Sequence, residues 1–364
     1  MEAGIVGLPN VGKSTLFNIL TKSKVEVANY PFCTIDPNVG IVDVPDDRLY
    51  ELAKIVNPQK IVPATVKFVD IAGLVRGASK GEGLGNKFLS HIREVDAIIH
   101  IVRCFVDENI VHVEGSINPL RDIEVINLEL ILADMESVER RLERVRKNSK
   151  SGNKAILQEL ELLEKFSEAL NRQIPVRTLN LSQEETQILK QLNLLTSKPV
   201  LYVANLSEED ILNQEENQYL KQLKEYAEKE GSKVIPICAK LEEDLINLSE
   251  EERKSFLEEL GLKEPGLNKL IRESYALLDL ITFFTAGPKE VHAWTIKRGT
   301  KAPQAAGKIH SDFERGFIRA EVISYENLIK CGSYTKARDE GLIRLEGKDY
   351  VVEDGDVVVF RFNV

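Results

Sequence analysis

The sequence predicts an α/β protein whose mostly parallel sheet carries a helical insertion and is followed by a small C-terminal α+β module. Two patterns lead to this prediction: short β-branched runs alternate with helical stretches, and after residue 279 the runs are separated by turn signals instead. Strands that alternate with helices form parallel sheets covered by helices on both faces. The expected strands of this sheet are AGIVG (3–7), TVKFVDIAG (65–73), DAIIHIV (96–102), PVLYVAN (199–205) and KVIPICA (233–239).

The composition excludes several classes of protein. The 364 residues are 43% hydrophobic and 29% charged, with a formal net charge of -10, which is typical of a globular chain and not of a disordered protein or a basic nucleic-acid coat. Four widely spaced cysteines predict a reducing compartment without a zinc site or disulfide framework. The sequence has neither a signal-type N-terminus nor ~18 consecutive apolar residues, so we expect a cytoplasmic protein with no membrane partner.

The stretch from about 126 to 196 interrupts the sheet pattern and predicts an antiparallel helical hairpin. Apolar residues recur at spacings of three and four on both sides of the loop NSKSGN (148–153), with Ser167 in one apolar position. The tip of the hairpin, residues 140–154, has seven Lys/Arg residues against Glu143 alone. These basic residues either follow a solvated helix end or contact the phosphates of RNA. The apolar seam consists of Ile131, Met135, Val138, Leu142 and Val145, then Ile156, Leu160, Leu163 and Leu170.

From residue 279 onward the pattern changes to short strands with one helical piece between them. The module contains thirteen Lys/Arg and thirteen Asp/Glu residues, so the net charge of -10 belongs entirely to residues 1–278. This difference in charge supports a separate C-terminal α+β domain. Its strand runs are LITFFTAGP, EVHAWTI, FIRAEVI and DYVVEDGDVVVFRF.

A phosphate-binding motif stands between the first predicted strand and the helical run TLFNIL (15–20). The octapeptide GLPNVGKS (7–14) fits GxxxxGK[ST], the P-loop pattern. In a P-loop, backbone N–H groups and the helix N-terminus bind phosphate, the lysine reaches the β- and γ-phosphates, and the hydroxyl ligates Mg²⁺. We therefore expect Lys13 to be catalytic and Ser14 to bind the metal. The expected nucleotide contacts of this segment are Gly7, Asn10, Val11, Gly12, Lys13, Ser14 and Thr15.

A second phosphate-site motif, Asp70-Ile71-Ala72-Gly73, ends the predicted strand 65–73. The carboxylate of Asp70 is expected to hold Mg²⁺ through water, and the N–H of Gly73 to contact the γ-phosphate. Thr34, which lies between the two motifs in TIDPNVG, is the expected second hydroxyl ligand of the metal. The predicted Mg²⁺ site therefore consists of Ser14, Thr34 and Asp70.

Longer segments extend these motifs into a family resemblance. Together with the P-loop, NYPFCTIDPNVG (29–40) and DIAGLVRGASKGEGLGNKFL (70–89) resemble an Obg-type G domain. The tetrapeptide NLSE and the tail RGTKAPQAAGKIHSDFERGFIRAEVI (298–323) resemble the YchF / Obg-like ATPase family over nearly the whole chain. The resemblance implies a P-loop NTPase G domain over 1–278, interrupted by the hairpin, and a TGS-type, ubiquitin-like domain over 279–364. It also implies ATPase activity and binding to the ribosome, either to the large subunit or to the whole particle.

The base-reading motif differs from that of a guanine site. Guanine-specific sites use NKxD, whose carboxylate accepts from N1–H and the 2-amino group, whereas this chain has Asn205-Leu206-Ser207-Glu208. Adenine lacks both of those donors. The absence of the lysine and the replacement of Asp by the longer Glu208 therefore favour ATP over GTP. Cys238-Ala239-Lys240 resembles the SAK loop that completes such a pocket. The expected base contacts are Asn205, Leu206, Glu208 and Ala239.

The residue expected to position the attacking water is also changed. Ras-like enzymes have a Gln after DxxG, but here the residue is Leu74, which cannot hydrogen-bond water. We therefore expect slow intrinsic turnover that needs another group or a partner. The resemblance implies that His112, in NIVHV, is that catalytic group, and a structural histidine is the alternative. The run GEGLG (81–85) is interpreted as the second switch.

The sequence thus favours a Mg²⁺-dependent ATP hydrolase that acts as a molecular switch, with ATP and the ribosome as partners and an RNA contact through residues 140–154. Two alternatives remain open. One is an Obg-type GTPase, which differs in base preference alone. The other is a nucleotide-gated RNA- or ribosome-binding module, in which ATP occupancy rather than hydrolysis is the output.

Overall fold

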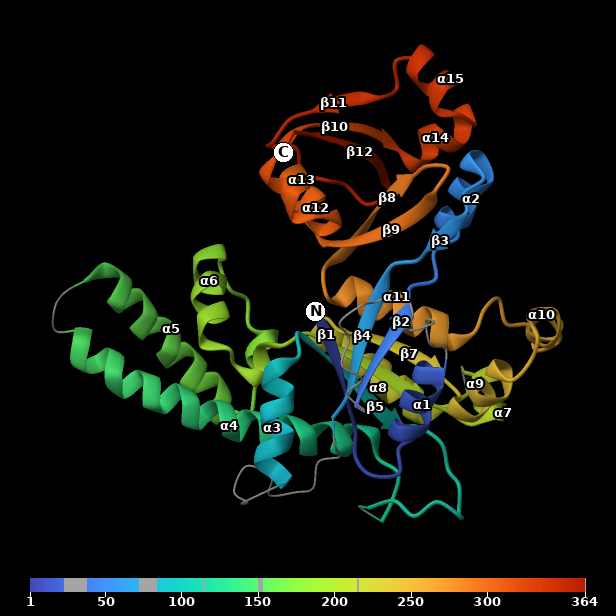
Figure 1. The fold of residues 1–364 in the computed structure, drawn as a ribbon. Helices are drawn as coiled ribbons and strands as arrows, with labels where there is room; N and C mark the ends of the chain where they lie inside the picture. The colour runs from blue at the N-terminus through green and yellow to red at the C-terminus, as the bar shows by residue number, and fades with distance from the viewer. Residues whose placement is uncertain (23–37, 72–83, 114, 150–152, 215, 364) are drawn as a thin grey trace. The chain divides into compact units, whose positions relative to one another are not determined.

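The computed structural model describes residues 1–22, 38–71, 84–113, 115–149, 153–214 and 216–363 (Figure 1). The chain forms two compact units. Of the described residues, the first unit contains 1–22, 38–40 and 67–270, with the gaps just given, and the second contains 41–66 and 271–363. The predicted domains instead placed residues 41–66 in the first domain and the boundary after residue 278.

The first unit is built on a six-stranded sheet, two of whose strands also include residues grouped with the second unit (41–43 and 65–66). Every strand predicted for this sheet is present. The pairings between β4, β1, β5, β6 and β7 are all parallel, so the carboxyl ends of these strands lie at one edge. All residues of β5 and β6 are buried, as expected for central strands covered on both faces. The strand order is β2 (Val39–Asp43), β4 (Thr65–Asp70), β1 (Glu2–Val6), β5 (Ala97–Arg103), β6 (Val200–Asn205) and β7 (Lys233–Ile237).

Helices alternate with these strands, as the pattern predicted. Those between the strands include α1 (Lys13–Lys22), α3 (Leu84–Glu94), α7 (Glu208–Leu212) and α8 (Gln218–Glu230). Three more follow the last strand: α9 (Ala239–Ile246), α10 (Glu250–Glu259) and α11 (Gly266–Leu277), the last of which runs across the boundary between the two units at 270/271.

The predicted helical hairpin is confirmed by α4 (Pro119–Asn148) and α5 (Lys154–Asn171), which lie side by side in Figure 1. The apolar seam predicted from the sequence forms a core of its own, but this core contains Phe166 where the pattern placed Ser167, and it also contains Leu162. Asn118 and Asn153 cap the two helices with their side chains. The insertion is completed by η3 (Val176–Thr178), α6 (Gln183–Leu192) and η4 (Leu195–Ser197).

A buried polar cluster attaches the insertion to the sheet of the first unit. Arg177 of η3 forms an ion pair with Glu230 of α8 at 2.7 Å, and both side chains are buried. The hydroxyl of Tyr202 on β6 donates to Glu230 at 2.6 Å, and Arg177 also donates to the side chain of Asn127 on α4 at 2.9 Å. Because buried charges are stable only when paired and hydrogen-bonded, this cluster fixes how the insertion is attached.

The second unit is built on a mixed six-stranded sheet. Its pairings are antiparallel except for β12–β8 and β3–β9, and its core includes Phe283, Ile296, Val322 and Val358. The strand order is β11 (Arg344–Glu346), β10 (Phe317–Ser324), β12 (Asp356–Phe362), β8 (Leu280–Ala286), β9 (Glu290–Lys297) and β3 (Lys60–Val62).

This unit is more helical than predicted. One helical piece was predicted after residue 279, whereas residues 279–363 contain four short helices. The additional helices have no visible helical period in the sequence because none is longer than eight residues. They are α12 (Ala302–Ile309), α13 (Ser311–Arg315), α14 (Tyr325–Cys331) and α15 (Tyr334–Asp339).

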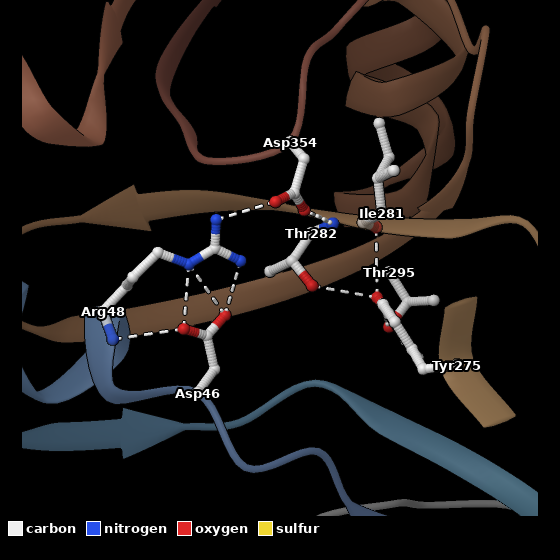
Figure 2. Close-up of polar contacts among 7 residues, drawn as sticks. All are labelled: Asp46, Arg48, Tyr275, Ile281, Thr282, Thr295 and Asp354. Carbon is white, nitrogen blue, oxygen red and sulfur yellow. Dashed lines mark hydrogen bonds and ion pairs between the residues drawn. The ribbon is translucent and has the colours of Figure 1, made fainter. Parts of the chain in front are cut away.

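Residues 41–66 contribute α2 (Asp47–Val56) and β3 to the second unit. Figure 2 shows the contact at the start of α2, where Arg48 binds the carboxylates of Asp46 and Asp354, each at 2.8 Å. The other oxygen of Asp354 accepts from the N–H of Thr282 on β8 at 2.9 Å. The segment is thus joined to the C-terminal domain by a charge-assisted network.

None of the helices in the described part of the chain is both long and apolar enough to cross a membrane.

Candidate nucleotide-binding site

The P-loop connects β1 to α1 in the first unit. Its backbone enters the left-handed region at Asn10 (φ 62°) and Gly12 (φ 96°), a conformation that glycine adopts without strain. A Cβ added to Gly12 would collide with the side-chain amide of Asn205, and one added to Gly7 would lie 2.9 Å from the carbonyl oxygen of Ile101. Both glycines are therefore required, Gly12 for the turn and Gly7 for close packing against β5.

Lys13 and Ser14 begin α1. The ammonium group of Lys13 forms an ion pair with the carboxylate of Asp70, the last residue of β4, and the N–H of Asp70 donates to the carbonyl oxygen of Asn38 at 2.8 Å. The first turn of α1 has no acidic residue, so its positive dipole end is available to a phosphate. The structure thus brings together the lysine and one of the carboxylates that were predicted from separate motifs. A hydroxyl and a carboxylate are the hard oxygen ligands that fit Mg²⁺.

Asn205, the last residue of β6, connects the P-loop with the N-terminus of α9, which follows β7. Its Nδ2 donates to the carbonyl oxygen of Val11 at 2.9 Å, and its Oδ1 accepts from the N–H of Ala239 at 3.1 Å. The residue is 5% exposed, so water competes little for either bond. Asn205 therefore fixes the phosphate loop to the N-terminus of α9, and three predicted site residues meet at this point.

The next two residues of the predicted base site differ in their surroundings. Leu206 is 2% exposed and its N–H donates to the carbonyl oxygen of Ile237 at 2.8 Å, so it packs mainly in the core. Glu208 begins α7 and forms an ion pair of 2.9 Å with Lys240. The carboxylate raises the pKa of Lys240 through this hydrogen bond. Because both side chains are largely exposed, the pair is weak and separates readily.

His112 lies in the loop that follows β5, beside the P-loop. The side-chain amide of Asn10 donates to the carbonyl oxygen of Val111 at 3.2 Å, which places this loop against the phosphate-binding turn. The Nε2 of His112 lies 2.8 Å from Oδ2 of Asp122 in the first turn of α4. His112 and Asp122 are 7% and 2% exposed. An imidazole held by a buried carboxylate is the arrangement that orients a general base.

Two further residues of this loop region, Asp122 and Arg103, were not predicted from the sequence. Asp122 was missed because no spacing rule connects a loop histidine to a helix ten residues later. Arg103 ends β5, and its buried guanidinium donates to three carbonyl groups of the following loop, those of Phe105, Asp107 and Ile110. It shapes the loop that carries His112, and only its position at the end of a buried strand distinguishes it in the sequence.

Several predicted site residues lie outside the described part of the chain. They are Thr34, Gly73 and Leu74, together with Gly81 and Gly83 of the GEGLG run. Their assigned roles stay predictions.

The basic hairpin tip divides into paired and unpaired side chains. Arg140, Arg141 and Arg146 contact Glu136, Glu159 and Glu164, respectively. Arg144, Lys147 and Lys154 form no ion pair with another described residue, whereas Lys150 lies outside that part of the chain.

A glycine-rich turn between a buried parallel strand and a helix, with Lys13 and Asp70 in contact, defines a P-loop nucleotide-binding protein of the G-domain type. Residues 2–133 match the family profile described as 50S ribosome-binding GTPase, and residues 280–363 match YchF-GTPase_C, a domain family of unknown function. Relatives that match the full length narrow the class further.

The chain is 59% identical over 364 residues to the Bacillus subtilis (strain 168) protein named ribosome-binding ATPase YchF, and the alignment covers 100% of both chains. It is 57% identical over 363 residues to the protein of that name from Escherichia coli O157:H7, covering 100% of this chain and 99% of that one. The solved structure of the Schizosaccharomyces pombe YchF GTPase superposes with a TM-score of 0.90 at 44% identity, covering 99% of this chain and 97% of that one. The chain belongs to the YchF family.

Proposed function

We propose that this chain is a Mg²⁺-dependent ATP hydrolase that acts as a molecular switch on the ribosome. Two of its bacterial relatives are named ribosome-binding ATPases, while the relative from Schizosaccharomyces pombe is named a GTPase. Members of the family are therefore named as ATPases and as a GTPase, so the base preference of this chain has to be argued from its own residues. The observation that carries the proposal is the sequence Asn205-Leu206-Ser207-Glu208 at the carboxyl end of β6.

A guanine site depends on a carboxylate that faces two N–H donors of the base and on a lysine that covers the base. Here the lysine position is Leu206, whose side chain packs mainly in the core, and the carboxylate of Glu208 contacts Lys240. A site that lacks the guanine-specific pair has no means of rejecting adenine, because discrimination by up to ~10⁴-fold requires matched buried polar groups. This supports a preference for ATP.

The remaining site residues have distinct roles in this proposal. Lys13 and the backbone N–H groups of the P-loop bind the β- and γ-phosphates, and these phosphates compete with Asp70 for the lysine ammonium. Ser14 and Asp70, with Thr34, would hold Mg²⁺, which neutralises charge on the transferring phosphoryl group when bound. Gly73 is assigned to the γ-phosphate.

Hydrolysis is assigned to His112, because Leu74 cannot position water. The buried contact with Asp122 holds the His112 ring, and the loop that carries it lies against Asn10 of the P-loop. We therefore expect slow turnover in the isolated protein.

The ATP preference is tested by kcat/KM for ATP and GTP, measured on the full chain with Mg²⁺. The expected result is a value for ATP at least about tenfold higher, and Lys13→Ala should abolish hydrolysis of both nucleotides. Glu208→Asp should shift the ratio toward GTP, whereas the neighbouring exposed carboxylate variant Glu209→Asp should leave it unchanged. A higher kcat/KM for GTP in the unmodified chain would instead support the GTPase alternative, which the name of the Schizosaccharomyces pombe relative favours.

The ribosome is the proposed partner, with an RNA contact through residues 140–154 and a location in the cytoplasm. The unpaired side chains of Lys147 and Lys154 at the hairpin tip favour a phosphate contact, and the C-terminal unit is the proposed TGS-type domain. Co-sedimentation with purified ribosomes should decrease as salt rises. The double variant Lys147→Glu/Lys154→Glu should weaken it further, whereas Lys190→Glu on α6 should not. Binding that stays constant over a wide salt range would exclude an RNA phosphate contact.

A further inference from the structure

A groove lies outside the nucleotide site, among α4, α5 and α6 of the helical insertion. Its volume is about 400 Å³, which is within the range of ligand-binding sites. Its lining combines aliphatic side chains from all three helices, here called the floor, with three arginines of α4, here called the rim. The lining residues are Ser137, Val138, Arg140, Arg141 and Arg144 from α4, Glu159 and Leu163 from α5, Ile188, Gln191 and Leu192 from α6, and Leu194.

The floor of the groove belongs to the core of the hairpin but is incompletely covered. Val138, Leu163 and Leu194 are buried, whereas Ile188 and Leu192 of α6 are only partly buried. No residue of α6 is fully buried, although the helix has an apolar face. Apolar surface that remains accessible beside charged residues is a common property of protein interaction sites.

The rim is positively charged in a protein whose net charge is -10. Arg141 is held by Glu159 across the hairpin. Arg140 has only an exposed contact of 3.6 Å with Glu136 on its own helix, and such pairs contribute little. Arg144 forms no ion pair with another described residue. The groove therefore presents at least two arginines to an acidic ligand.

The lining distinguishes between a nucleic acid and a protein as the ligand. Unstacked bases bind to aromatic side chains, and none of the residues that line this groove is aromatic. An aliphatic floor with a charged rim instead fits the apolar face of a helix whose flanking residues are acidic. We propose that this groove binds an acidic, amphipathic helical segment of a partner protein. The apolar residues of the segment would lie on Ile188 and Leu192, and its carboxylates would pair with Arg140 and Arg144.

Fluorescence anisotropy with the full chain tests this binding directly. The probe is a labelled synthetic helix of about fifteen residues, with Leu at positions i, i+3, i+4 and i+7 and Glu on both flanks. A peptide of the same composition in scrambled order and a single-stranded RNA of similar charge serve as competitors. The designed helix should bind at least about tenfold more tightly than either. Equal or tighter binding of the scrambled peptide or the RNA would overturn the proposal.

Variants locate the binding site on the groove. Arg144→Glu and Ile188→Ser, one on the rim and one on the floor, should each weaken peptide binding about tenfold. The matched control is Lys190→Glu, which alters an exposed basic residue of α6 that does not line the groove. A thermal midpoint within about 2 °C of the original shows that a variant is folded. The proposal is refuted if both groove variants bind the peptide like the unmodified chain.

A second copy of this chain is an alternative occupant of the groove. Light scattering over a range of protein concentrations would then show a dimer that Arg144→Glu dissociates, and the designed peptide would not bind. This outcome would overturn the proposal. Arg140 and Arg144 also belong to the segment 140–154 that is proposed to contact RNA, so tighter binding of the RNA would overturn this inference while supporting that contact. The assays contain no nucleotide, so neither result bears on the proposed ATP hydrolysis.

Discussion

Replacing Asn205 by alanine should weaken binding of ATP and GTP to the same extent. The side chain forms two buried hydrogen bonds, to the carbonyl oxygen of Val11 and from the N–H of Ala239. Each bond contributes about 1 kcal/mol, and the two backbone groups left unpaired add to the loss. We therefore expect the free energy of unfolding of the first unit to fall by about 2–4 kcal/mol, or its thermal midpoint by about 5–10 °C.

The matched control for this variant is Asn217→Ala. Asn217 is also buried and also bridges two backbone groups, the carbonyl oxygen of Cys104 at 2.9 Å and the N–H of Leu220 at 2.8 Å. It should lose a similar amount of stability without contacting the P-loop. Titration calorimetry with both nucleotides should show a loss of affinity in Asn205→Ala alone, with the ATP:GTP ratio unchanged. An equal loss of affinity in both variants, or a changed ratio in Asn205→Ala, would refute this role for Asn205.

Three further perturbations test other parts of the molecule. Asp122→Asn should lower kcat for ATP about tenfold with little change in KM if His112 is a base that it orients, and full activity of His112→Ala in the same assay would remove this role. The carboxylate of Glu242 on α9 is buried where it accepts from the N–H of Gly266, and this burial raises its pKa from 4.5 to about 7. Between these pH values the folded chain binds a proton that the unfolded chain has released, so the free energy of unfolding falls as pH rises through this range. Glu242→Gln should flatten that decline in thermal midpoints from pH 5 to 8, and an unchanged slope would contradict it. Arg48→Met should lower the free energy of unfolding of the second unit by about 1–3 kcal/mol, because the carboxylate of Asp354 loses its cation. Denaturation followed by fluorescence of the single tryptophan, which lies in that unit, measures this loss. An unaltered midpoint would exclude a stabilising role for Arg48.

Local patterns were sufficient to predict much of the fold and the phosphate site. The β-branched runs corresponded to the strands of the parallel sheet because buried central strands have no polar face. The spacing of three and four in the hairpin identified its core, since neighbouring turns of a helix place those residues on one side. Lys13 and Asp70 were assigned from separate motifs, and their contact in the structure follows from the parallel pairing of β1 with β4.

Contacts between distant segments were not predictable in the same way. The helix α2 has an ordinary amphipathic pattern, and nothing local indicates that Arg48 pairs with Asp354, 306 residues further along the chain. The contact of His112 with Asp122 likewise depends on a loop whose backbone carbonyl groups are held by the guanidinium of Arg103. In the hairpin, Phe166 fills the core position that the pattern gave to Ser167, because the spacing from Leu163 to the next core residue is three residues and not four.

The most direct test of the central claim is a parallel equilibrium titration of the full chain with ATP and GTP in the presence of Mg²⁺. The base site predicts that ATP binds at least about tenfold more tightly, because Leu206 and Glu208 no longer provide the guanine-specific contacts. Tenfold tighter binding of GTP would contradict this interpretation of the base site and would make the chain a GTPase of the Obg type.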